Sequence, residues 1–188
     1  MMNKKQRELV DALMRQTLPL DVFRREYFAP EVEPAEQLLE QLVGATEEKS
    51  EDDVDLLLFV GFSLELFSPE YVPALARLLP QDWHHSHEDI ARLLQELKDP
   101  RAIDALYETA LTTYEYRDYD EVFSLARKCT WALADIGTPD ALSRLKELAA
   151  CGNPAIEGFA RKRIDAWEKE KDRKGINTPP PDRPDGGE

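Results

Sequence analysis

The sequence has few of the residues that build catalytic and metal-binding sites. Its 188 residues include 2 cysteines, 3 histidines and 8 glycines. Cys129 and Cys151 lie far apart and form no C-x-x-C motif, so we expect reduced thiols in or near a core. No glycine-rich phosphate loop is present, and no serine or cysteine stands beside a base at a motif spacing. The sequence therefore predicts no enzyme, no cofactor and no metal ion.

Long apolar runs are also missing. The longest run, residues 56–62, is far shorter than the roughly 20 residues of a membrane-spanning helix, and its flanks are acidic. No apolar stretch follows Lys4 and Lys5, so a signal peptide is not expected. Together with the reduced cysteines, these absences predict a cytoplasmic protein that does not enter membranes.

Basic residues are fewer than acidic ones. The chain has 24 Lys and Arg against 38 Asp and Glu, a formal net charge of −14 and a pI near 4.7. Such a chain repels phosphate backbones, which argues against a nucleic-acid partner and against helical-repeat DNA glycosylases, whose groove must be basic. A charged partner would be basic, although simple solubility also explains the charge.

One short unit recurs along the chain. Residues 99–106 and 138–145 each begin with a helix-capping residue and a proline at the first helical position. A weaker copy is residues 68–75. In residues 99–106 and 138–145 a small residue, an aliphatic residue and a leucine fall on one helical face. Starts about 31 and 39 residues apart are typical of arrays of helix pairs.

Apolar residues recur at helical spacing along most of the chain and no stretch alternates like a strand, which predicts an all-α fold. The predicted helices are residues 4–16, 22–28, 34–43, 51–67, 69–79, 87–98, 100–113, 121–136, 139–150 and 154–171. Gly44 and Gly137 are predicted helix stops. Ser50 with Asp53, and Ser86 with Asp89, are predicted capping boxes. Helix 51–67 is apolar nearly all round, so we expect it at the centre of the core.

The chain is predicted to hold one domain over residues 1–171, since its length suits a single core. Residues 172–188 contain mainly proline, glycine and charged residues. Such a segment cannot bury enough apolar surface to order itself, so we predict a disordered tail.

Residues 131–141 (WALADIGTPDA) are the piece closest to a known repeat. They resemble the A-L-G-x-I-G-D-P-x-A segment of short bacterial HEAT-like repeats, and this resemblance covers roughly residues 68–170. It implies a short right-handed α-solenoid of HEAT-like helix pairs, about five in number, with repeats over about 51–171 and a non-repeat helical N-terminal part. Such arrays scaffold many unrelated tasks, so the fold alone names no function.

A narrower resemblance covers residues 82–90, 97–101, 116–120 and 126–133. These stretches resemble bacterial HEAT-repeat proteins that accompany polymorphic toxins of the Rhs or contact-dependent type as immunity proteins. The resemblance implies a cytoplasmic inhibitor that binds its cognate toxin domain stoichiometrically. Nuclease toxins are basic, so the charge of −14 would favour fast association with one. The alternative is a general HEAT-like adaptor that binds another cellular protein.

Residues 82–88 are the first candidate binding site. Trp, His and acidic side chains that lie next to one another can anchor a protein partner. The selected residues are Asp82, Trp83, His84, His85 and Glu88. A metal site is a competing interpretation, but no helical ligand spacing such as H-E-x-x-H is present. The third interpretation is a plain helix-entry loop in which Trp83 packs before the Ser86 cap.

The connector over residues 114–120 is the second candidate site. Tyrosines interleaved with acids suit a basic protein surface. The selected residues are Tyr114, Glu115, Tyr116, Asp118, Tyr119 and Asp120. Alternatively, the tyrosines pack locally and the acids cap the next helix. This segment lies about 30 residues after the first candidate, close to one repeat, so we expect both on the same edge of the array.

The polar side of the second helix of a pair is the third candidate site. Helices of this kind line the concave surface of repeat arrays. The selected residues are Asp104, Tyr107 and Glu108. The alternative is an ordinary solvated face.

Overall fold

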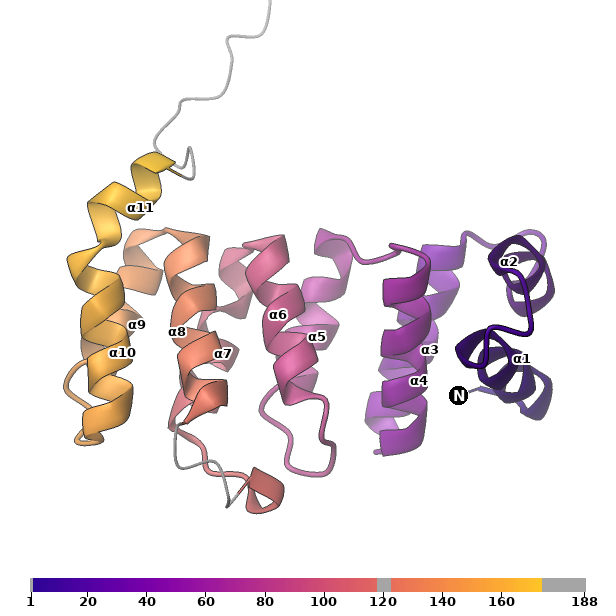
Figure 1. Cartoon of the computed structure of the whole chain (residues 1–188), viewed down its shortest axis with the longest axis horizontal. Helices are drawn as coiled ribbons and strands as arrows, with labels where there is room; N and C mark the ends of the chain where they lie inside the picture. Colours follow the sequence, from indigo (N-terminus) through magenta and orange to yellow (C-terminus); the bar gives the residue numbers. More distant parts are fainter. Residues whose placement is uncertain (1, 118–122, 174–188) are drawn as a thin grey trace, which may run out of the picture.

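The fold is a row of helices (Figure 1). The computed structural model describes residues 2–117 and 123–173, and every regular element within these ranges is a helix. The α-helices are α1 (Lys4–Met14), α2 (Leu20–Tyr27), α3 (Pro34–Glu47), α4 (Glu51–Ser63), α5 (Val72–Leu78), α6 (His87–Leu97), α7 (Ile103–Leu111), α8 (Ser124–Ile136), α9 (Pro139–Leu148), α10 (Pro154–Asp165) and α11 (Trp167–Arg173). The short 3-10 helices are η1 (Pro69–Tyr71), η2 (Pro100–Ala102) and η3 (Glu115–Arg117).

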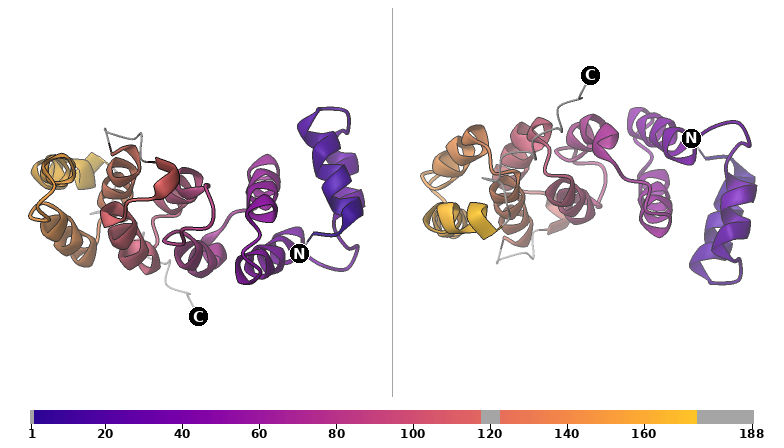
Figure 2. Two further views of the ribbon diagram at one scale, coloured as in Figure 1. Left: turned by 90° about the horizontal axis from the view of Figure 1, so that it is seen from below. Right: turned by 90° about the horizontal axis from the view of Figure 1, so that it is seen from above.

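The helices from α3 to α10 form two layers (Figures 1 and 2). α4, α6, α8 and α10 lie side by side in one layer, and α3, α5, α7 and α9 lie behind them. The helices pack in pairs, because each amphipathic helix needs a neighbour to cover its apolar stripe. The predicted all-α solenoid of HEAT-like pairs is therefore confirmed, while its right-handedness stays a prediction.

The recurring unit starts a helix in all three of its copies. The side chains of Asp99 and Thr138 each accept a backbone N–H of the first turn, at 2.9 and 3.3 Å, so both predicted caps are present. In the copies at residues 68–75 and 99–106, the proline opens a 3-10 turn that leads into α5 or α7. In the third copy, Pro139 opens α9 directly.

The junction between α3 and α4 differs from the prediction. Gly44 is an interior residue of α3 and not its stop, because the chain turns only at Lys49, which adopts a left-handed φ of 52°. The Ser50 side chain makes no capping hydrogen bond. Asp53, its predicted capping-box partner, is instead buried and pairs with Arg7 of α1 at 2.6 Å.

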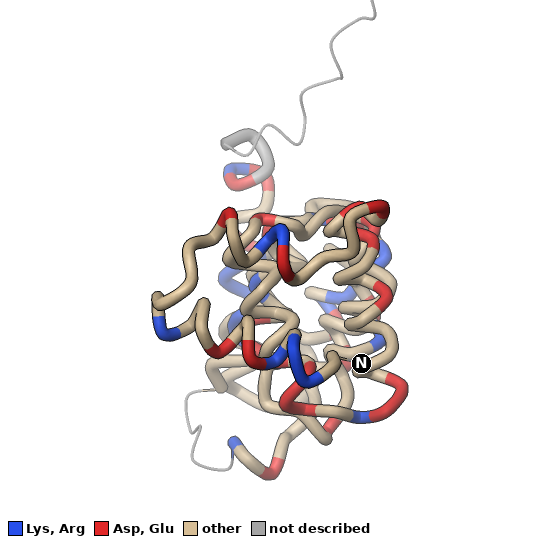
Figure 3. The backbone as a smooth tube through the Cα atoms, turned by 90° about the vertical axis from the view of Figure 1, so that its right-hand side faces the viewer, with Lys and Arg blue, Asp and Glu red and all other residues tan. Residues whose placement is uncertain are grey.

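This ion pair fastens the N-terminal helices to the stack. α1 and α2 run across the end of the row and cover the outer side of α3 and α4 (Figures 1 and 2). Figure 3 looks onto this end, where Lys and Arg residues lie among the acidic ones. A buried carboxylate needs such a partner, since an unpaired buried charge is strongly destabilising.

The predicted end of α4 at residue 67 is wrong, since the helix ends at Ser63. Glu65 adopts a left-handed φ of 54° and turns the chain. The ring of Phe67 then returns against Gly61, where an added Cβ would lie 2.3 Å from it. The absence of a side chain at Gly61 therefore allows this close approach.

α8 lies at the centre of the core, and not α4 as predicted. α8 packs on α6, α7, α9 and α10, and its Cys129 and Leu133 side chains are fully buried. Burial raises the pKa of the Cys129 thiol to about 12, which keeps it protonated. α4 packs mainly on α3 and α1, and its Phe59 and Phe62 side chains stay half-buried.

The predicted last helix, residues 154–171, is divided in two. α10 ends at Asp165, and α11 begins at Trp167. The guanidinium of Arg163 lies 3.6 Å above the ring of Trp131 and pairs with Glu170 at 2.7 Å. These contacts join α11 to the last pairs of the stack.

The predicted disordered tail begins inside α11, which continues to Arg173. Residues 174–188 lie outside the described residues. Within the described ranges, the helices are too short or too polar to cross a membrane.

The central position of α8 predicts the effect of truncating its core. We expect Leu133→Ala to lower the free energy of unfolding by about 2–5 kcal/mol, because the side chain is fully buried and leaves a cavity. Leu111→Ala is the matched control, since Leu111 is 43% exposed and should cost less than about 1 kcal/mol. Urea unfolding followed by circular dichroism measures both, and equal losses would contradict this account of the core.

Candidate functional site

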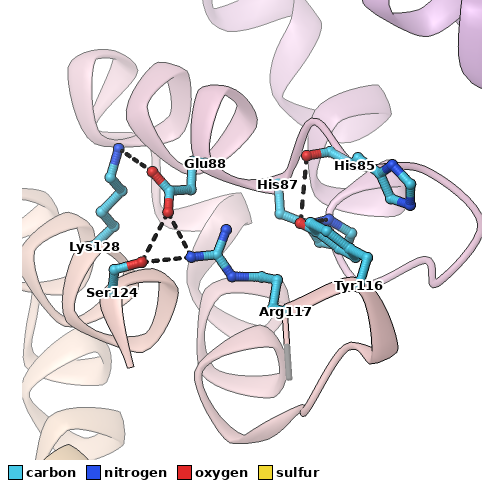
Figure 4. A network of polar contacts seen from close by, with 7 residues as sticks. All are labelled: His85, His87, Glu88, Tyr116, Arg117, Ser124 and Lys128. Carbon is cyan, nitrogen blue, oxygen red and sulfur yellow. Dashed lines mark hydrogen bonds and ion pairs between the residues drawn. The ribbon is translucent and has the colours of Figure 1, made fainter. Parts of the chain in front are cut away.

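Two segments that are far apart in the sequence meet at one edge of the stack. Residues 81–88 lead from α5 into α6, and residues 112–117, which include η3, follow α7 (Figure 1). The Tyr116 hydroxyl lies 2.9 Å from Nδ1 of His87 and 3.3 Å from the carbonyl oxygen of His85 (Figure 4). The predicted shared edge is confirmed by these contacts. We call the surface formed by the two segments the polar edge.

His84 and His87 form the inner support of the polar edge. Their rings stack with centroids 4.2 Å apart, and both residues are fully buried. Nε2 of each ring lies beside a backbone carbonyl oxygen, at 2.9 Å for His84 and 2.8 Å for His87. Because a carbonyl oxygen only accepts, each Nε2 carries the proton. Nδ1 then accepts a hydrogen bond from the Ser86 N–H in His84 and from the Tyr116 hydroxyl in His87.

Both buried histidines are neutral. Burial lowers the pKa of His84, and burial followed by the neighbouring His84 ring lowers the pKa of His87 to about 3. Since both nitrogens of each ring are used, neither ring offers a lone pair to a metal ion. In the part of the chain that the structure describes, no group of three His, Cys, Asp or Glu residues is arranged to hold one.

Glu88, in the first turn of α6, fastens the second side of the polar edge (Figure 4). Its carboxylate lies 2.6 Å from Nη2 of Arg117, 2.9 Å from the Ser124 hydroxyl and 2.9 Å from Nζ of Lys128. Burial acts to raise the pKa of Glu88, but hydrogen bonds from Lys128, Ser124 and Arg117 outweigh it and lower the pKa to about 2. One charged carboxylate therefore joins α6, η3 and α8.

Sequence reasoning missed Arg117, Ser124 and Lys128 as parts of this site. The partners of Glu88 lie 29 residues away at Arg117 and 36 residues away at Ser124. A helical pattern reveals pairs three or four residues apart, because those share one helix face. Nothing in the sequence indicates which side chains meet between different helices.

Ser86 is the N-cap residue of α6, but its side chain makes no capping hydrogen bond, so the predicted capping box does not form. Its hydroxyl instead donates to the carboxylate of Asp55 on α4. This hydrogen bond ties the start of α6 to α4. The carboxylates in the first turn of α6, Glu88 and Asp89, interact favourably with the positive end of its helix dipole.

Six predicted residues of the first two candidate sites reach the surface of the polar edge. Asp82, His85 and Glu115 are exposed, and Trp83, Glu88 and Tyr116 are half-buried. Between the two segments lies a hollow of about 480 Å³, lined by Asp82, His85, Thr113, Tyr114, Glu115 and Tyr116. The exposed His85 ring lies against Tyr116, with centroids 4.2 Å apart, and its Nδ1 is 2.9 Å from a carboxylate oxygen of Glu51.

Two of the predicted binding residues lie inside the protein, which corrects their role. His84 is 0% and Tyr114 is 3% exposed, so their side chains support the polar edge from within. The Tyr114 ring packs on His87 at a centroid distance of 3.9 Å. Asp118, Tyr119 and Asp120 lie outside the described residues.

The third predicted site lies in the other layer and is not part of the polar edge. Asp104 accepts from Arg144 of α9 at 2.7 Å, and the Arg144 guanidinium lies 4.7 Å from the centre of the Tyr107 ring. Glu108 is exposed on the same helix. These contacts brace α7 against α9, and a binding role for Asp104, Tyr107 and Glu108 stays a prediction.

The buried histidines predict a loss of stability in mild acid. The folded-state pKa of each lies below the usual 6.5, so the unfolded chain binds more protons once the pH falls below that value. The stabilisation is complete above pH 6.5 and is lost as the pH falls toward 3. We expect the free energy of unfolding to fall by roughly 1–2 kcal/mol between pH 7.5 and 5.5.

Urea unfolding at the two pH values measures this difference. His87→Gln should reduce it, because this buried ring then no longer takes up a proton on unfolding. Equal pH dependence in His87→Gln and the wild type would show that the buried His87 ring does not cause it.

Comparison with known proteins places a repeat in the last part of the stack. A family model described as PBS lyase HEAT-like repeat matches residues 125–151. These residues comprise most of α8, all of α9 and the turn that follows, and they include residues 131–141. Searches of curated proteins and of solved structures returned no match. The matched repeat and the paired helices beside it together support a HEAT-like repeat protein.

Proposed function

We propose that this protein binds another protein through the polar edge, and that this partner is a bacterial toxin domain which it neutralises. HEAT-like repeats generally mediate protein–protein interaction, and the fold is typically a non-enzymatic scaffold. The proposal has two levels, a binding role for the polar edge and an immunity role toward a toxin.

The binding role is supported by one observation above all, the fixed geometry of the polar edge. Tyr116 is held by His87, and Arg117 and Lys128 are held by Glu88 (Figure 4). Side chains that are already ordered lose less conformational entropy when a partner binds, which leaves more of the contact energy for affinity. Tyrosine and acidic groups presented this way suit a basic protein surface.

The immunity role is supported by the resemblance and by charge. Residues 82–90, which belong to the resemblance to immunity proteins, supply one half of the polar edge. The net charge of −14 would attract a basic toxin domain and speed its association. Binding over the active site of the toxin, or over a surface it needs, would block its activity.

The immunity role is tested by co-expression with the toxin domain encoded beside this protein. We expect the toxin domain alone to stop growth of the host cells and co-expression of this protein to restore it. A purified one-to-one complex should form in parallel. If the neighbouring domain is harmless, or if it is toxic and no rescue occurs, the adaptor function becomes the better interpretation.

The role of the polar edge predicts how charge reversal changes association. Asp82→Lys and Glu115→Lys should each slow association with a basic partner by about 2–10-fold at low salt, because both carboxylates are exposed on the edge. Asp21→Lys on α2 is the matched control, with the same change of charge at an exposed site on a distant helix. Stopped-flow association at low and physiological salt measures the effect. Equal slowing in all three variants would assign it to net charge and not to the edge.

A further inference from the structure

α4 presents apolar side chains that its neighbours cover only in part. Its residues are apolar nearly all round, a pattern that indicates a helix covered on several sides. Yet it packs mainly on α3 and α1, whereas α6, the next helix of the same layer, packs on α5 and α8. Phe59 and Phe62 stay half-buried on the side toward α6. The two phenylalanines therefore offer a partly exposed apolar contact to a partner that reaches the space between α4 and α6.

A groove of about 500 Å³ lies between α4 and α6 at this strip. It is lined by Asp55, Leu58, Phe59, Phe62, His85, Ser86, Asp89 and Arg92. Its volume falls within the roughly 300–1,000 Å³ of pockets that enclose drug-sized ligands. The groove is therefore large enough to take a few side chains of a bound segment, and we call it the α4–α6 groove.

The walls of the α4–α6 groove are acidic. Asp55 on α4 and Asp89 on α6 are both exposed, and they line the groove from its two helices. Among the residues that line the groove, Arg92 is the one lysine or arginine, and its guanidinium lies 4.5 Å from the centre of the Phe62 ring.

The α4–α6 groove continues into the polar edge. His85 lines both this groove and the hollow between the two segments of the edge. Ser86, which follows it, hydrogen-bonds to Asp55 across the two helices. A partner seated on the polar edge would therefore reach the groove without leaving the surface of the protein.

We propose that the α4–α6 groove binds a basic segment of the protein partner. An apolar side chain of that segment packs on Phe59 and Phe62, and lysines or arginines on either side of it pair with Asp55 and Asp89. The apolar floor explains why the occupant carries an apolar residue, and the two acidic walls explain the basic residues that flank it. The inference rests on the proposed function in one respect, which is that the occupant belongs to a protein partner.

The test uses the full chain and a synthetic peptide. The probe is a fluorescein-labelled peptide of about 12 residues built from leucine pairs and lysines, and fluorescence anisotropy measures its Kd. Asp55→Asn combined with Asp89→Asn should weaken binding by about tenfold, because two exposed ion pairs are lost. Arg92→Gln should tighten binding a few-fold, because it removes the repelling charge. Asp140→Asn, at an exposed carboxylate on α9, is the matched control and should change nothing.

The opposite directions of these changes separate the proposal from simple unfolding. Loss of structure would weaken binding in every variant and could not produce the tightening expected for Arg92→Gln. A second peptide with every lysine replaced by glutamate should not bind, and a third with every leucine replaced by serine should bind weakly. The inference is overturned if the lysine–leucine peptide does not bind, if the glutamate peptide binds equally well, or if the double variant and the Asp140→Asn control behave alike.

A further measurement tests the alternative that a second copy of this chain occupies the groove. Sedimentation should show the same oligomeric state for the wild type and the double variant. A dimer that is lost in the double variant would assign the groove to self-association and overturn the inference.

Toxin binding by the same variants separates this inference from the proposed function. If Glu115→Lys weakens toxin binding while the groove variants leave it unchanged, the inference fails and the immunity role stands. If the peptide results are as expected but co-expression gives no rescue, the groove is a basic-segment site and the immunity role fails.

Discussion

Every helix pair in this protein depends on the next pair to bury its apolar side. α8 shows the dependence most fully, because it packs on α6, α7, α9 and α10 and its Leu133 and Cys129 are fully buried. A single pair has too little apolar area to offset the entropy of ordering its residues, so stability comes from stacking. The ends of such a stack need separate cover. α1 and α2 supply it at one end, where Arg7 pairs with the buried Asp53. At the other end, α11 is held near the stacking of Arg163 on Trp131.

The same constraint explains where a surface is left for binding. α4 has the composition of a fully covered helix, but its neighbour in the same layer stands apart across a groove. The exposed parts of the Phe59 and Phe62 rings contact water, which is unfavourable, and a bound partner would remove this contact. Arg92 covers part of Phe62 in the free protein. The groove between α4 and α6 thus leaves apolar side chains within reach of a partner, whereas close packing of the two helices would bury them.

The polar edge illustrates how polar groups inside a helical stack become rigid. His84 and His87 are buried without charge, and each ring nitrogen has a hydrogen-bonding neighbour. Glu88 keeps its charge because Arg117, Ser124 and Lys128 surround it. A buried polar network that is fully satisfied fixes one arrangement of the chain, whereas an unsatisfied one destabilises it. The two histidines and the Glu88 carboxylate thus hold the side chains of the polar edge in one arrangement.

The sequence by itself determined the helices, their grouping into repeats and the common edge of residues 81–88 and 112–117. These features depend on local signals, since the caps at Asp99 and Thr138 and the helical spacing of apolar residues act within a few positions. Segments one repeat apart then fall at equivalent places in a regular stack. Only the tertiary structure decided that α8 is central and that the Ser86 hydroxyl donates to Asp55 and makes no capping hydrogen bond to α6. It alone also brought Glu88 to its distant donors and left the α4–α6 groove open, because these outcomes depend on which side chains of different helices meet in space.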